Sequence, residues 1–136
     1  MNIPKAVGAA IAETGAAVYV EALPQGFRAP CFFVREVKHS CVRTVGERFR
    51  EKAEIVIVYH PKDKQNAREE CAEVSNSLFE QLEFVKTDDG LIHGIEKRSE
   101  IENGTLSFYV SFEFFTLIGS KTEKMESLNY NSSPIC

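Results

Sequence analysis

The sequence predicts an α+β domain, with one antiparallel or mixed sheet of four to five strands and two helices packed on one face. Three observations support this fold class. Two segments repeat apolar residues at helical spacing, several others alternate apolar and polar residues, and Asn103-Gly104 marks a tight hairpin turn. The chain has 136 residues, 43% of them hydrophobic, and a net charge of −4, which suits one soluble domain with one core.

The first third of the chain predicts a helix followed by two strands. The helix is expected over Pro4–Thr14, with proline in its first turn and Gly15 just past its end. Val18–Leu23 and Cys31–Lys38 read as strands. The loop between the strands, Pro24–Pro30, has a proline at each end and one glycine.

The middle third predicts a long strand and an amphipathic helix. Arg48–His60 alternates, with apolar residues on one face at its start and on both faces at its end. Pro61 ends this strand, and Asp63 is expected to cap a helix that runs to about Phe84. The apolar stripe of the helix consists of Ala67, Cys71, Val74, Leu78 and Leu82, with Phe79 beside it, and the opposite face carries Glu69, Glu70, Glu73, Glu80 and Glu83.

The last third predicts a β-hairpin around Asn103-Gly104. Its strands are expected near 91–101 and 106–117, and a two-residue turn places Glu102 opposite Thr105. The same register continues as Ile101 with Leu106, Ile95 with Phe112, His93 with Phe114 and Leu91 with Thr116. We therefore expect a shared core face of Leu106, Phe108, Val110, Phe112, Phe114, Ile95 and Leu91.

The length of these strands predicts that part of the sheet protrudes. A domain of this size has a diameter of roughly 37 Å, whereas a strand over Arg48–His60 spans roughly 43 Å. At least one long β-hairpin should therefore protrude from the globule or curve strongly, and exposed strand edges of this kind can pair with another chain. Residues 1–118 form the predicted domain, and the polar residues 119–136 are expected to be a tail or an arm that orders on a partner.

No catalytic or metal-binding motif is present. Glycine-rich phosphate loops, zinc-protease motifs, nucleophile elbows and paired cysteines are all absent, so we expect no cofactor and no metal. Cys41 with His39 is the strongest candidate for a catalytic pair, which leaves open a small cytosolic enzyme or ligand-binding domain. No apolar run is long enough to cross a membrane, and the acidic balance argues against binding dominated by nucleic-acid phosphates.

Basic residues gather in the stretch that precedes the acidic helix. Arg35, Lys38, Arg43, Arg48, Arg50 and Lys52 stand there against four acidic residues. One interpretation is a solvated ribbon. The other is complementarity between subunits, in which the basic ribbon of one copy meets the acidic helix of another.

The residues around the first loop resemble a family of small proteins, the phage tail terminator-like proteins of Gram-positive phages and prophages. The resemblance runs through Pro24-Gln-Gly-Phe27 and Pro30-Cys-Phe-Phe-Val34, which are its most specific part. It continues through Gly46–Arg50 into 55–61, and ends at Phe112-Glu-Phe-Phe115. In all it covers residues 3–118.

The resemblance implies a structural component without enzymatic activity, located in the tail or neck of the virion and made in the cytoplasm of the bacterial host. Such proteins cap the tail tube, stop its polymerisation and join it to the head. The implied partners are other copies of this chain in a homohexameric ring, the tail tube protein and the head-tail connector or stopper protein. DNA would only pass through the lumen, and no membrane is involved. Another neck or head-completion adaptor is the alternative within the same class.

The loop supplies the remaining candidate interface residues, which are Pro24, Gln25, Gly26, Phe27 and Arg28. The two prolines of the segment restrict its backbone, and Gly26 allows a close approach. Phe27 would then be an apolar anchor for a neighbour. The alternative is that Phe27 folds back onto its own core. From the ribbon, Arg43, Arg48, Arg50 and Lys52 complete the predicted interface.

Overall fold

The structure is a computed structural model that describes residues 2–44, 46 and 48–117. The predicted C-terminal arm, residues 119–136, lies outside the described residues. The elements in chain order are α1 (Ile3–Ile11), the 3₁₀ helix η1 (Ala12–Thr14), β1 (Ala17–Val20), β2 (Cys31–Arg43), β3 (Arg48–His60), α2 (Ala67–Gln81), β4 (Phe84–Thr87), β5 (Gly90–Glu102) and β6 (Thr105–Leu117).

The sheet has six strands in the order β1-β2-β3-β6-β5-β4, one more than the upper limit that the sequence predicts. The additional strand is β4, whose four residues were expected to belong to the end of the second helix or to a loop. The sheet is mixed, because β1 lies parallel to β2 while every other pair is antiparallel. The α+β class is confirmed, and the strand count is corrected.

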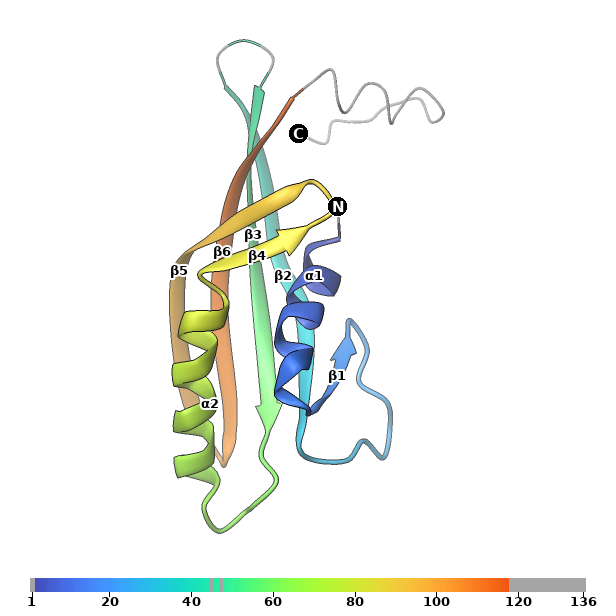
Figure 1. The fold of residues 1–136 in the computed structure, drawn as a ribbon, viewed down its shortest axis with the longest axis vertical. Coiled ribbons are helices and arrows are strands. Elements are labelled where there is room, and N and C mark those ends of the chain that lie inside the picture. The colour runs from blue at the N-terminus through green and yellow to red at the C-terminus, as the bar shows by residue number, and fades with distance from the viewer. Residues whose placement is uncertain (1, 45, 47, 118–136) are drawn as a thin grey trace.

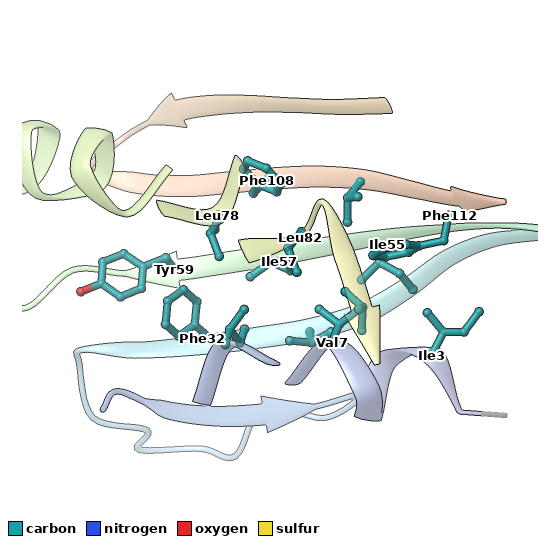
Figure 2. Close-up of a cluster of buried hydrophobic side chains, with 14 of the residues drawn as sticks. Ile3, Val7, Phe32, Ile55, Ile57, Tyr59, Leu78, Leu82, Phe108 and Phe112 are labelled. Atoms are coloured by element: carbon teal, nitrogen blue, oxygen red, sulfur yellow. The ribbon is translucent and has the colours of Figure 1, made fainter. Parts of the chain in front are cut away.

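Both α-helices pack on the same face of the sheet, as predicted. The apolar stripe of α1 contributes Ile3, Val7 and Ile11 to the core, and α2 contributes Cys71 and Leu78. Figure 2 shows the side chains of the strands meeting those of the helices in a single layer. The buried aromatic and aliphatic residues of the strands are Phe32, Val34, Ile55, Ile57, Tyr59, Leu106, Phe108, Val110 and Phe112.

One end of the sheet protrudes beyond the helices. Strands β2, β3 and β6 each have 13 residues, and in Figure 1 their ends extend past α1 and α2. We call this part the ribbon, and define it as 37–43 of β2, 48–54 of β3 and 111–117 of β6. The β2 strand is longer than the predicted Cys31–Lys38 and reaches Arg43. The protruding hairpin that strand length predicts is therefore present.

Helix α2 begins at Ala67, three residues later than a cap at Asp63 predicts. Asp63 does not cap the helix, because its Oδ1 accepts from the main-chain N–H of Gln65 at 2.9 Å and its Oδ2 from Asn66 Nδ2 at 3.0 Å. These bonds close a turn before the helix, and they lower the pKa of Asp63. The predicted end near Phe84 is also wrong, since α2 ends at Gln81.

The hairpin register is correct near the turn and wrong beyond a β-bulge. Glu102 pairs with Thr105 and Ile101 with Leu106, as predicted. The register shifts between Gly94 and Glu96, where Ile95 is the extra residue. The predicted pairs of Ile95, His93 and Leu91 are replaced by Gly94 with Phe112, His93 with Glu113, and Leu91 with Lys86 of β4.

The bulge also changes which β5 residues enter the core. Leu91 and Ile95 were expected on the core face, but they are 68% and 41% exposed. Ile92 is buried instead. The bulge is explained by Gly94, whose N–H donates to the carbonyl oxygen of Glu83 at 2.9 Å. A side chain at this position would collide with the carbonyl oxygen of Leu82, so only glycine lets β5 pass so close to the end of α2.

Candidate assembly interface

The outer face of the ribbon, which points away from the helices, gathers three of the four basic residues that the ribbon contributes to the predicted interface. Arg48, Arg50 and Lys52 alternate along β3 and therefore share this face. Their partners come from β6 and from β5, the strand beyond it: Arg50 Nε lies 4.0 Å from Glu113 Oε2, and Lys52 Nζ lies 3.0 Å from Glu96 Oε1. The prediction that these residues form one surface agrees with the register of β3.

Arg43 is not part of that surface. It pairs across the sheet with Phe49, which belongs to the opposite face of β3. Its guanidinium carbon lies 6.0 Å from the centre of the Phe49 ring. The structure therefore separates Arg43 from Arg48, Arg50 and Lys52, the other basic residues of the ribbon in the predicted interface.

The end of the ribbon combines exposed apolar and cationic groups on its outer face. We call this part the ribbon tip, and it consists of Val42, Arg48, Arg50 and Phe115. Val42 pairs with Arg50, which pairs on its other side with Phe115, so these three side chains form one row across the ribbon. Val42 and Phe115 are about half exposed. The guanidinium carbon of Arg48 lies 4.3 Å from the centre of the Phe115 ring. Arginine and an aromatic residue side by side are typical of energetically important interface positions.

The predicted loop interface lies at the other end of the molecule. The loop precedes Cys31, which pairs with His60 at the end of β3 farthest from the ribbon tip (Figure 1). Pro24, Gln25, Gly26 and Arg28 are exposed, and Gly26 has a φ of 71°, a value that suits glycine.

Phe27 is half-buried against its own chain. The centre of its ring lies 4.6 Å from that of His60, with the rings inclined by 48°. Burial lowers the pKa of His60. The structure thus places Phe27 on the outside of the sheet end, in contact with His60, and part of its surface is open to a neighbour.

The acidic face of α2 divides into two groups. Glu69, Glu73 and Glu80 are exposed. Glu83 is engaged within the chain, by Lys97 and by His93 Nε2 at 2.8 Å. Hydrogen bonds from these two side chains lower the pKa of Glu83.

Glu70 is also engaged, at the junction between β3 and α2. Its carboxylate accepts from the Tyr59 hydroxyl at 2.6 Å and from the main-chain N–H groups of Lys62 and Asp63 at 2.7 and 3.1 Å. Burial raises the pKa of Glu70, but these three hydrogen bonds outweigh it, and the pKa is lowered. Burial and the Glu70 carboxylate in turn raise the pKa of Tyr59.

A groove beside α2 escaped the sequence analysis. It has a volume of about 390 Å³ and lies between α2 and the turn that joins η1 to β1. Its residues are Thr14, Gly15, Ala16, Pro30, Phe32, Tyr59, Glu73, Val74, Ser77, Leu78 and Gln81. Because they come from four separate segments, no local pattern in the sequence could have indicated the groove.

In the candidate catalytic pair of Cys41 and His39, the histidine has carboxylate partners. His39 is oriented by carboxylates, with Nε2 3.0 Å from Glu51 Oε1 and Nδ1 3.4 Å from Glu36 Oε2. Cys31 and Cys71 are buried thiols, and burial raises their pKa values. Among the described residues, no group of three or more histidine, cysteine or acidic side chains could hold a metal ion. None of the described helices is long and apolar enough to span a membrane.

The fold is therefore that of a small α+β protein with a mixed six-stranded sheet, helices on one face and a protruding ribbon. The model of one family, described as phage tail terminator protein, matches residues 2–125. The chain therefore belongs to the phage tail terminator family, as its resemblance implied. The family assignment supports a structural role in the phage tail.

Comparisons with individual proteins add little. No curated protein matches the chain. One of the solved structures that match has 9% sequence identity to this chain and a TM-score of 0.42. The match covers 85% of this chain and 92% of the other.

Proposed function

We propose that this chain caps the tail tube of a phage, stops its polymerisation and joins it to the head connector, by assembling with other copies into a ring. The match of the terminator family model over residues 2–125 carries this proposal. The ring is a homohexamer in the proposal, located at the neck of the virion. Its partners are the tail tube protein and the connector or stopper protein, and DNA passes through the lumen.

The geometry of the chain supports self-assembly between unlike surfaces. The ribbon tip and the loop of residues 24–28 lie at opposite ends of the long axis (Figure 1). A contact between two different surfaces of identical subunits repeats from copy to copy, and it closes into a ring when the rotation permits. A contact of this kind needs complementary surfaces and no reacting groups, so the proposed role is non-enzymatic.

The proposal is tested by following tail tube polymerisation with the purified tube protein of the same phage. A cap should stop elongation at substoichiometric amounts, because each tube has one terminal ring. The measurement is the distribution of tube lengths by electron microscopy, with an unrelated acidic protein as the control. Tubes of unchanged length at equimolar protein would contradict capping. Binding to the connector without an effect on tube length would identify another neck adaptor instead.

A further inference from the structure

The groove beside α2 has an apolar floor and a polar wall. Phe32, Tyr59 and Leu78 form part of the floor, and Figure 2 shows these three side chains close together at one end of the core. Glu73, an exposed carboxylate, stands on the α2 side of the groove. At about 390 Å³, the groove is large enough for one or two side chains of a partner.

Gln81 gives the groove an unsatisfied acceptor. Its Oε1 atom is buried and has no hydrogen-bond partner among the described residues. A buried polar atom without a partner is costly, and native proteins contain few of them. A donor supplied from outside would remove this cost. The groove therefore favours a partner that presents an N–H group together with an apolar surface.

The ribbon tip has this combination of groups. Arg48 has five N–H donors on its guanidinium, and its aromatic neighbour Phe115 is 51% exposed. Arg50 and Lys52 have carboxylate partners within the sheet, whereas no described acidic side chain lies within ion-pair distance of Arg48. The charge at the tip is thus available for a carboxylate outside the chain.

We propose that the groove beside α2 accepts the ribbon tip of a second copy of this chain. In this contact the Arg48 guanidinium lies near the Glu73 carboxylate, and Phe115 covers the apolar floor. Rotation of the Gln81 side chain, which lines the groove, brings its buried Oε1 to the guanidinium as an acceptor. Helix α2 and the turn from η1 to β1, which border the groove, lie away from the ribbon tip (Figure 1). Each copy can therefore offer its tip to one neighbour and its groove to another. The inference rests on the proposed ring and specifies the contact that would build it.

Two charge-reversed variants test this contact, Arg48→Glu and Glu73→Arg. Each alone places like charges together, and we expect each to weaken self-association about tenfold or more. An equimolar mixture of the two should recover it, because every native tip then meets a native groove and every reversed tip meets a reversed groove. Self-association is measured by sedimentation velocity and by mass photometry over a range of concentrations, alone and on tail tubes.

Two matched variants control for net charge. Lys38→Glu changes an exposed residue of the ribbon outside the tip row, and Glu80→Arg changes an exposed residue of α2 outside the groove. Both should assemble as the unchanged chain does. Equal weakening by the controls would show general charge attraction and would overturn the proposed contact.

Gln81→Leu provides an independent test. It removes the unsatisfied acceptor, so the free energy of unfolding of the monomer should be unchanged or higher, while self-association weakens. Rings that form normally from all three groove and tip variants would overturn the contact and leave the capping proposal intact. Variants that form rings but no longer bind tubes would also overturn the contact and leave the capping proposal intact, since the groove would then bind the tube protein. A chain that never associates, alone or on tubes, would overturn both proposals.

Discussion

Gly94 of β5 lies against the carbonyl oxygen of Leu82, at the point where α2 has just ended, with no room for a side chain between them. The N–H of the same glycine donates to the carbonyl of Glu83. The β-bulge at Ile95 follows directly and turns the start of β5 away from β6 and toward β4. One glycine therefore determines how the edge of the sheet is built.

Replacing Gly94 with alanine should destabilise the domain strongly. The added methyl group meets main-chain atoms, which cannot move without shifting β5 or the end of α2. We expect the free energy of unfolding to fall by about 2 kcal/mol or more, measured by urea denaturation. Gly8→Ala is the matched control. Its methyl would meet only the side chains of Val18 and Val20, and alanine favours the helix, so its effect should remain within about 1 kcal/mol. Equal stability of the two variants would contradict this account of the bulge.

Adjacent residues of β5 test which side of the strand faces the core. Ile92 is 4% exposed, whereas Leu91 is 68% exposed. Ile92→Ala should cost about 2–4 kcal/mol of unfolding free energy, because it leaves a cavity. Leu91→Ala should change it by less than about 0.5 kcal/mol. A larger loss of unfolding free energy for Leu91→Ala than for Ile92→Ala would contradict the bulge and favour the uninterrupted register that alternation alone predicts.

The carboxylate of Glu70 should make stability depend on pH. Its pKa in the folded protein lies below the ordinary value of 4.5, so the folded state binds fewer protons than the unfolded state. The stabilisation is therefore fully present above about pH 4.5 and is lost as the pH falls through the lowered pKa. We expect Glu70→Gln to lower the melting temperature at pH 7 and to converge with the unchanged chain in acid. Glu69→Gln, an exposed neighbour, should keep the original pH profile. A constant difference between Glu70→Gln and the unchanged chain at all pH values would contradict the assignment.

Phe27→Ala separates the two roles that the sequence left open for this residue. Because the ring is half-buried against His60, its loss should lower the free energy of unfolding by about 1 kcal/mol. If Phe27 is also an anchor, self-association should weaken far more than this small change explains. Melting and sedimentation of the same preparation give both values. Normal assembly with reduced melting would assign Phe27 to the fold alone.

Much of the fold could be predicted from local patterns. The alternation of Arg48–His60 matches β3 residue for residue, and Asn103-Gly104 gives the hairpin turn and the first pairs beyond it. Both features depend on neighbours along one or two strands. They are visible in the sequence because burial on one face imposes a period of two.

The errors have a different origin. The bulge at Ile95 depends on the approach of Gly94 to Leu82, and β4 forms because that bulge redirects β5. The later start of α2 depends on Asp63 and Glu70 using their carboxylates in the preceding turn. These are tertiary contacts between segments that no periodicity connects. The groove was missed for the same reason, whereas the shared face of Arg48, Arg50 and Lys52 follows from their spacing along one strand.

The central pair of the sheet, β3 with β6, joins the two halves of the chain, since Arg48 lies opposite Leu117 and Tyr59 opposite Leu106. During synthesis, β3 leaves the ribosome long before its partner exists. The middle of the sheet can therefore close only when translation is nearly complete, and pairings so distant in sequence are slow to form. A nascent chain with an unpaired β3 is exposed to premature contacts with other copies. A protein of this topology is therefore prone to aggregation until its last strand has docked.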